Sequence, residues 1–139
     1  MILDAKEYLM QVEYLTCKIR GDRARVKQLR DAAESTTGIA NTERVQSSGS
    51  GDPMGRAVGS YLDLEAEIRK DEQKLREIIE TINQLRGPEK TVIYQYYVMG
   101  KFLYEIASDM QKSYSWVSKK HVKGIDGVQA ILDSKKAGA

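Results

Sequence analysis

The sequence predicts an all-α protein in which a long antiparallel coiled-coil hairpin is followed by a head of three helices. Apolar residues recur at alternating three- and four-residue steps over two long stretches, and a polar stretch separates them. Gly87-Pro88 then marks the end of one helix and the start of another. We therefore expect the hairpin over residues 1–86, the head over residues 88–133 and a frayed polar tail over residues 134–139.

The first long helix is expected to begin at Asp4, because Asp4 and Glu7 have the spacing of a capping box. Its apolar seam keeps regular steps of three and four residues if Asp22 fills one position. The seam comprises Tyr8, Val12, Leu15, Ile19, Asp22, Val26, Leu29 and Ala33. Residues 35–53 are rich in Ser, Thr, Gly and Asn, so we expect them to form a long polar loop.

The second long helix is expected over residues 53–85, with a seam of the same kind that again contains one aspartate. This seam comprises Met54, Ala57, Tyr61, Leu64, Ile68, Asp71, Leu75, Ile78, Ile82 and Leu85. In a symmetric hairpin Asp22 and Asp71 lie at about the same level, where two carboxylates repel each other unless a cation pairs with them. The available cations are Lys18, Arg25, Lys70 and Lys74. Such a polar pair fixes the register of a coiled coil; the alternative is a solvated gap in the seam.

Three shorter helices are expected in the head. The first spans residues 89–99, where some of Val92, Ile93, Tyr96 and Tyr97 are buried, and it stops at Gly100. The second spans residues 103–110. Ser113 caps the third, which continues through His121 to Gly124 or beyond, although Gly124 and Gly127 weaken its far end.

Basic charge is concentrated in the last third of the chain. Residues 1–87 carry 14 basic and 15 acidic side chains, whereas residues 88–139 carry 8 lysines and 5 acids. Residues 112–123 contain four lysines and no acid. A localised basic face of this kind is typical of proteins that bind nucleic acid.

Residues 103–124 have the pattern of a helix-turn-helix, a motif whose second helix enters the major groove of DNA. The residues expected to be buried between its helices are Ile106, Ala107, Met110 and Val117. On the recognition helix, residues 113–124, the side chains expected to contact bases are Tyr114, Ser115, Ser118 and Lys119. Those expected to contact phosphates are Lys112, Ser113, Lys120 and Lys123. Trp116 is expected to pack against the helix over residues 89–99 rather than to lie toward the DNA backbone.

The same residues resemble region 4 of sigma-70-type factors, which pairs a Glu-Ile-Ala helix with a recognition helix capped by Ser or Thr. The matching segments are Gly-Lys-Phe-Leu-Tyr-Glu-Ile-Ala-Ser-Asp-Met over residues 100–110 and Ser-Tyr-Ser-Trp-Val-Ser-Lys-Lys-His over residues 113–121. The chain departs from that pattern at Phe102 and Gln111, where a polar cap and a glycine are usual. It also departs at Lys120, where an aliphatic residue is normally buried.

The whole chain also resembles an uncharacterised phage and prophage family of Gram-positive bacteria that has a C-terminus of this type. Members of that family have a similar Ala-Lys-Glu-Tyr-Leu start, residues 5–9 here, and a similar Glu-Arg-Val-Gln-Ser-Ser-Gly-Ser segment, residues 43–50 here. The resemblance implies phage-linked transcriptional control, and region 4-like heads also imply contact with RNA polymerase.

Little in the sequence indicates an enzyme or a membrane protein. His121 is the only histidine and Cys17 the only cysteine, so no cluster of Cys and His ligands is possible and no metal or cofactor is expected. Ser47-Ser-Gly-Ser-Gly51 lacks the Lys-Ser/Thr of a phosphate-binding loop. The chain has neither a long apolar run nor a signal peptide pattern at its start, so we expect a cytoplasmic protein.

Two functions are therefore expected from different classes. The first is a sequence-specific regulator that binds double-stranded DNA and forms a dimer or larger homo-oligomer through its hairpin. The alternative is a protein-interaction module that binds RNA polymerase or another host protein through the hairpin and head, with little affinity for DNA.

Overall fold

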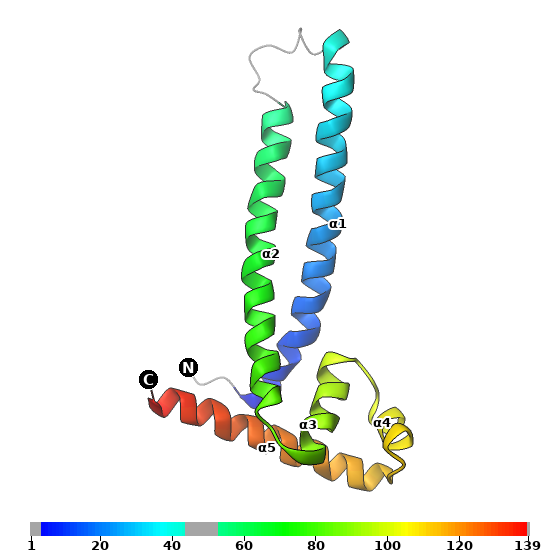
Figure 1. The fold of residues 1–139 in the computed structure, drawn as a ribbon, viewed down its shortest axis with the longest axis vertical. Coiled ribbons are helices and arrows are strands. Elements are labelled where there is room, and N and C mark those ends of the chain that lie inside the picture. The colour runs from blue at the N-terminus through cyan, green and yellow to red at the C-terminus, as the bar shows by residue number, and fades with distance from the viewer. Residues whose placement is uncertain (1–3, 44–52, 139) are drawn as a thin grey trace. The chain divides into compact units, whose positions relative to one another are not determined.

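Every element that the structure describes is helical, which confirms the predicted all-α class (Figure 1). The structure is a computed structural model that describes the backbone of residues 4–43 and 53–138 and the side chains of residues 4–34 and 61–138. The elements in chain order are α1 (Ala5–Glu43), α2 (Pro53–Asn83), α3 (Gly87–Ile93), the π-helix η2 (Tyr94–Val98), α4 (Leu103–Met110) and α5 (Tyr114–Gly138). None of the helices in these ranges is long and apolar enough to cross a membrane.

The chain divides into two compact units, and α1 and α2 contribute to both. The hairpin unit consists of Cys17–Glu72, and the head unit consists of Met1–Thr16 together with Gln73–Ala139. This division does not coincide with the boundary expected at Gly87-Pro88, which is instead the start of α3. Gly87 has the positive φ of 66° that suits a residue without a Cβ, and Pro88 lies in the first turn of α3 as expected.

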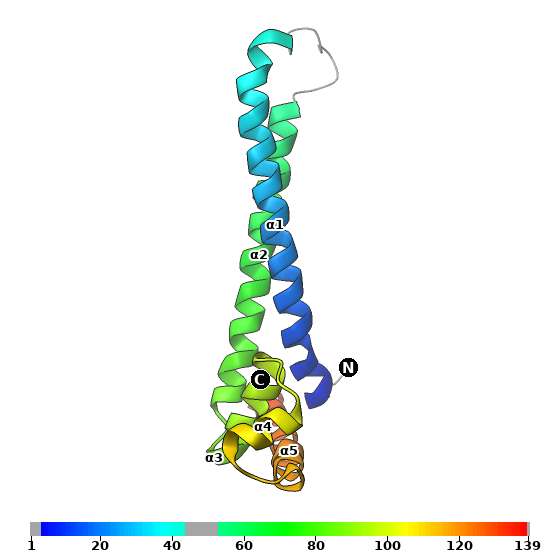
Figure 2. The same cartoon turned by 90° about the vertical axis from the view of Figure 1, so that its right-hand side faces the viewer.

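In the hairpin unit α1 and α2 run side by side in opposite directions (Figures 1 and 2). Ile19, Val26 and Ile68 of the two apolar seams are buried between them. Pairs of oppositely charged side chains join the helices along this seam, including Arg23 with Glu72 and Arg30 with Glu65, which lie on the same flank. The seams that the sequence identified therefore pack against each other within a single chain.

The two aspartates of the seams share one lysine. Lys18 Nζ lies 2.5 Å from Asp71 Oδ2 and 3.7 Å from Asp22 Oδ2, and it also contacts Glu67 Oε1 at 2.8 Å. Hydrogen bonds to Asp71 and Glu67 raise the pKa of Lys18 above its ordinary value. Asp71 is only 6% exposed, so the alternative prediction of a solvated gap in the seam is wrong at this residue. Lys18 is therefore the cation that pairs with the aspartates of the two seams.

The head unit has a core to which α1, α2, α3, η2 and α5 all contribute. Its buried residues are Ala5, Leu9, Val12, Leu15, Ile78, Ile82, Leu85, Ile93, Tyr97 and Val128. Ile125, Ile131 and Leu132 of α5 pack against this cluster. The second half of α5 is therefore part of the core rather than an extension from it.

The prediction of a frayed tail over residues 134–139 is wrong, because α5 continues to Gly138. Lys135 Nζ donates a hydrogen bond to Oγ1 of the buried Thr81 at 3.2 Å. Earlier in the same helix, Gln129 Oε1 accepts a hydrogen bond from the Ala5 N–H at 2.9 Å. Contacts with α1 and α2 thus hold a polar segment helical, which its composition did not indicate. Ala139 lies outside the described residues.

The prediction of a polar loop over residues 35–53 is wrong for residues 35–43, because α1 continues through Glu43. Extending an existing helix adds one hydrogen bond for each residue that becomes fixed, so a segment of modest helix propensity and no proline can follow a well-formed helix. Residues 44–52, which hold nearly all of the segment 43–50 noted above, lie outside the described residues.

The helix expected over residues 89–99 is divided into α3 and the π-helix η2. The Met99 N–H donates to the Tyr94 oxygen at 3.2 Å, which is the wider i to i+5 bond of a π-turn. Gly100 follows with a φ of 72° and ends the element where the sequence predicted. Sequence periodicity cannot distinguish a π-turn from α-helix over so short a stretch.

Two substitutions of glycine by alanine are expected to change stability in opposite directions. A Cβ on Gly124 would lie 2.3 Å from Ile93 Cγ1, whereas nothing lies within 4 Å of a Cβ on Gly21. Gly124→Ala should lower the unfolding free energy, because overpacking costs about 1–3 kcal/mol and the gain in helix propensity is about 1 kcal/mol. Gly21→Ala should be neutral or stabilising. Urea unfolding followed by circular dichroism measures both, and a Gly124→Ala variant as stable as the unmodified chain would contradict the close packing of α5 on α3.

Removal of the shared lysine is expected to destabilise the hairpin unit. Lys18→Met leaves Asp71 buried without its cation, so the midpoint of thermal unfolding should fall. Adding Asp71→Leu should restore much of the loss, because the buried charge is then gone as well. Lys27→Met, which alters an exposed lysine of the same helix, is the matched control. Equal midpoints for the Lys18 and Lys27 variants would show that the shared lysine does not stabilise the seam.

Candidate nucleic-acid interface

A tight turn of three residues joins α4 to α5. Gln111 has left-handed backbone angles, with φ 56° and ψ 44°, at the position where the sequence showed glutamine in place of the usual glycine. The Lys112 N–H donates to the Ala107 oxygen at 3.0 Å, which closes the end of α4. A left-handed conformation is uncommon for a residue with a Cβ, so the packing of the two helices must hold the turn in place.

That packing is a second apolar cluster, distinct from the main core of the head unit. It consists of the buried residues Val92, Ile106, Ala107 and Val117, with Leu103, Met110, Tyr96 and Trp116 partly buried around them. The predicted set between the helices is confirmed for Ile106, Ala107 and Val117, and Met110 lies at its edge. Trp116 packs on this cluster, which contains Val92 of α3, as the sequence predicted.

Ser113 caps the first turn of α5. Its Oγ accepts a hydrogen bond from the Trp116 N–H at 3.1 Å, and its carbonyl oxygen accepts from the Val117 N–H at 3.1 Å. This arrangement satisfies one of the free N–H groups at the start of the helix. The Ser113 hydroxyl therefore has a structural partner in the head unit.

The four side chains expected to contact bases lie on the outer side of the first turns of α5. Tyr114 is 57% exposed, Ser115 and Lys119 are exposed, and Ser118 is partly exposed. In a helix, residues four apart share one face, so Tyr114 lies next to Ser118 and Ser115 lies next to Lys119. The structure thus brings the predicted base-contacting residues together on one surface.

The lysines expected to contact phosphates do not all have the same environment. Lys112 and Lys123 are exposed. Lys120 is only 22% exposed, and its Nζ lies 3.5 Å from Oε1 of Glu89 in the first turn of α3. Lys112 Nζ and Lys120 Nζ lie 5.2 and 5.4 Å from the centre of the Trp116 ring. Glu89 is a residue of this region that the sequence did not identify, because it precedes Lys120 by a long stretch of chain.

The residue before α4 has no polar side chain to cap the helix, as the sequence indicated. A glutamate of the first turn provides a different hydrogen bond there. Glu105 Oε1 accepts a hydrogen bond from the Phe102 N–H at 2.9 Å. The Phe102 ring, which cannot accept a hydrogen bond, is 61% exposed and stacks on Tyr104, itself 64% exposed, with ring centroids 5.5 Å apart. No pattern in the sequence indicated this exposed aromatic pair.

His121 lies on the inner side of α5. Its Nε2 is 3.2 Å from the Tyr97 hydroxyl, and its ring contacts the rings of Tyr96 and Tyr97. Burial, and to a smaller degree the charge of Lys6, lowers the pKa of His121. Burial, with smaller contributions from Tyr96 and Asp4, raises the pKa of Tyr97 to about 12. The lowered pKa favours the neutral imidazole, and the ring packs within the head unit.

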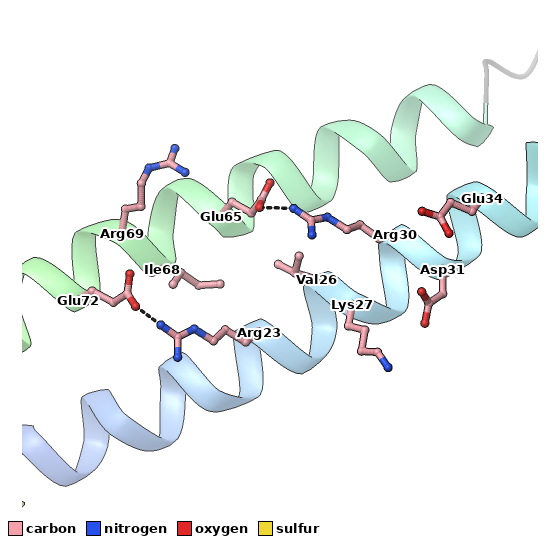
Figure 3. Close-up of a pocket in the computed structure, with 10 residues that line it drawn as sticks. All are labelled: Arg23, Val26, Lys27, Arg30, Asp31, Glu34, Glu65, Ile68, Arg69 and Glu72. Carbon is pink, nitrogen blue, oxygen red and sulfur yellow. Dashed lines mark hydrogen bonds and ion pairs between the residues drawn. The ribbon is translucent and has the colours of Figure 1, made fainter.

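In the part of the chain that the structure describes, the hairpin unit does not offer a comparable charged site. A groove of the hairpin unit has four basic and four acidic side chains in its lining, and two ion pairs cross it (Figure 3). Its floor is formed by Val26 and Ile68. A lining without an excess of either charge does not select a charged ligand. Among the described residues, no three His, Cys, Asp or Glu side chains are placed to hold a metal ion.

The lowered pKa of His121 is expected to make stability depend on pH. The unfolded chain, with the ordinary pKa of 6.5, binds a proton more readily than the folded chain, so the unfolding free energy falls as the pH drops through and below that value. Thermal unfolding midpoints from about pH 7.5 to about pH 5.5 should fall more steeply for the unmodified protein than for His121→Gln. Parallel curves for the two proteins would contradict the burial of a neutral histidine.

No family model, no curated protein and no solved structure matches this chain. The resemblance to sigma-70 region 4 and to a phage family therefore stays a prediction, and the function has to be inferred from the residues of the chain itself.

Proposed function

We propose that the chain is a sequence-specific transcription regulator that binds double-stranded DNA, with residues 113–124 of α5 in the major groove. The observation that supports this most is the outer face of the first turns of α5. It presents hydroxyl groups and lysines, while residues 112–123 contain no acid. Such a face is complementary to phosphates and to the acceptor groups at the edges of guanine.

The arrangement of α4 and α5 supports a helix-turn-helix. Two helices are joined by three residues, a small alanine lies between them, and the second helix begins with a serine cap. In such motifs the second helix inserts its N-terminal residues between the two DNA backbones, while the first crosses the backbone. On this reading Lys119 contacts a base, and Lys112 and Lys123 contact phosphates. The positive end of the α5 dipole adds to the attraction for phosphate.

The proposed contacts make affinity depend mostly on charge. Serine and tyrosine form few base-specific pairs of hydrogen bonds, and Lys119 is the one exposed residue of the base-contacting set that can pair well with guanine. A single head should therefore discriminate weakly between sequences and lose affinity steeply with salt. Strong specificity would require a second head or a partner protein.

The homo-oligomer expected from the sequence stays a prediction. The seams of α1 and α2 are buried against each other within the hairpin unit, at Ile19, Val26 and Ile68. A dimer would therefore have to form through a different surface of the chain. Light scattering of the purified protein at several concentrations determines whether one is present.

One observation favours the alternative function of protein binding. Phe102 and Tyr104 expose two stacked rings at the start of α4, and exposed aromatic residues are enriched at protein interfaces. A pull-down at high salt would recover RNA polymerase or another host protein if this surface dominates. Binding of that kind together with no affinity for duplex DNA would favour this function over the first.

Reversing two charges of α5 is expected to weaken DNA binding strongly. Lys119→Glu with Lys123→Glu should reduce the affinity for a duplex from the protein's own locus by at least about tenfold, because two contacts to DNA become repulsive. Fluorescence anisotropy of labelled duplex at about 50 and about 200 mM salt measures the effect. Lys70→Glu with Lys74→Glu, an equal change of charge at exposed positions of α2, is the matched control.

The two double variants separate a specific surface from general charge. The control should retain most of its affinity, since α2 is not part of the proposed interface. Unchanged binding of the α5 variant, or an equal loss in both variants, would exclude α5 as the DNA-binding helix. Circular dichroism of each variant confirms that the altered residues, which are exposed, leave the fold intact.

A further inference from the structure

We propose that Glu89 is an internal counter-ion that occupies, in the free protein, the place of a DNA phosphate beside Lys120. The inference rests on the proposed function and assigns a further residue to it. On binding, Lys120 exchanges the carboxylate of Glu89 for a phosphate of the DNA backbone. Glu89 thereby lowers the affinity of α5 for DNA of any sequence. Only a duplex whose phosphate reaches Lys120 can contact all the lysines of residues 112–123.

The geometry of the pair distinguishes Lys120 from the other lysines of α5. Lys120 Nζ lies 3.5 Å from Glu89 Oε1, and the two side chains are 22% and 23% exposed. The separation is within the range of an ion pair and longer than a close hydrogen bond. Both side chains of the pair are partly exposed to solvent. An incoming anion can therefore reach Lys120 and displace the carboxylate.

The tryptophan ring keeps Lys120 in position when its partner changes. Lys112 Nζ and Lys120 Nζ both lie over the ring of Trp116, at 5.2 and 5.4 Å from its centre. A cation at this distance is attracted to the aromatic face. Each of the two ammonium groups thus contacts this ring, and among the described residues only Lys120 is paired with a carboxylate. The ring therefore holds Lys120 at a position where an oxygen of a phosphodiester can replace the carboxylate of Glu89.

Close packing of α5 on α3 brings Glu89 to this point. A Cβ on Gly124 would lie 3.4 Å from the Glu89 carbonyl oxygen, so the first turn of α3 lies directly over the turn of α5 that follows Lys120. Residues 120 and 124 share one face of α5 because they are four apart. A carboxylate in the first turn of a helix is also favoured by the helix dipole. The acid is thus held by the fold and not by Lys120 alone.

The ion pair of Lys120 and Glu89 reduces the positive charge that residues 112–123 present to DNA. Residues 112–123 contain four lysines, and Glu89 neutralises one of them in the free protein. Non-specific affinity for DNA follows the number of phosphates that cations neutralise, with a salt slope of about −0.9 for each contact. Removing Glu89 should therefore strengthen binding to any duplex, and most at low salt.

Glu89→Gln is the direct test, because it removes the charge and keeps the shape of the side chain. We expect a gain in duplex affinity of about three- to tenfold at about 50 mM salt, measured by anisotropy and by the fluorescence of Trp116, the single tryptophan. Asp126→Asn, which removes an exposed acid from α5, is the matched control and should change affinity less than about twofold. Glu89→Asp, which keeps the charge on a shorter side chain, provides a second variant if Glu89→Gln folds poorly.

A double-mutant cycle with Lys120→Met shows whether the gain acts through Lys120. The exchange predicts that Glu89→Gln adds affinity in the unmodified chain and adds none in the Lys120→Met background. A gain that persists without Lys120, or an affinity unchanged or reduced by Glu89→Gln while the unmodified chain binds, would overturn the inference. No duplex binding by the unmodified chain and all variants would instead overturn the proposed function, and this inference with it.

Discussion

The close packing of α5 against α3 and the end of α2 is the constraint on which the rest of the head unit depends. Two glycines of α5 make it possible: a Cβ on Gly124 would meet Ile93 at 2.3 Å, and a Cβ on Gly127 would meet Leu85 at 2.8 Å. Val128 is fully buried just beyond them. The same helix that carries the exposed lysines in its first turns is therefore core in its later turns. Because the helix is continuous, the orientation of its basic face is fixed by the core.

The environment of each polar side chain on α5 follows from this packing. On the inner side His121 contacts Tyr97, and Lys120 pairs with Glu89 over the ring of Trp116. On the outer side the remaining lysines of residues 112–123 and the hydroxyl groups have solvent around them. Buried polar groups require partners, whereas exposed ones are free to bind a ligand. The structure thus separates His121, which packs inside the head unit, and Lys120, which is paired with Glu89, from the polar side chains of α5 that are in solvent.

Much of the fold could be predicted from local signals in the sequence. Residues 103–110 form α4 as expected, and Ser113 caps α5. Most described seam positions of α1 and α2 are buried, whereas others, such as Leu29, Leu64 and Leu75, are partly exposed. The failures were at positions where contacts override composition. Residues 35–43 are helical despite their Ser, Thr and Gly content, and residues 134–138 are helical with Lys135 bonded to Thr81. Glu89 could not be linked to Lys120 from sequence, because only the close approach at Gly124 brings them together.

The claim that the first turns of α5 bind duplex DNA is tested most directly by mapping backbone amide signals with and without a duplex by nuclear magnetic resonance. This measurement locates the contact surface without any substitution. The amides of residues 112–123 should shift or become protected on titration, and the changes should weaken as salt is raised. Amides of the hairpin unit over residues 61–72 should stay unchanged at low occupancy. Changes confined to that unit, or to the start of α4 around Phe102 and Tyr104, would contradict the placement of α5 in the major groove.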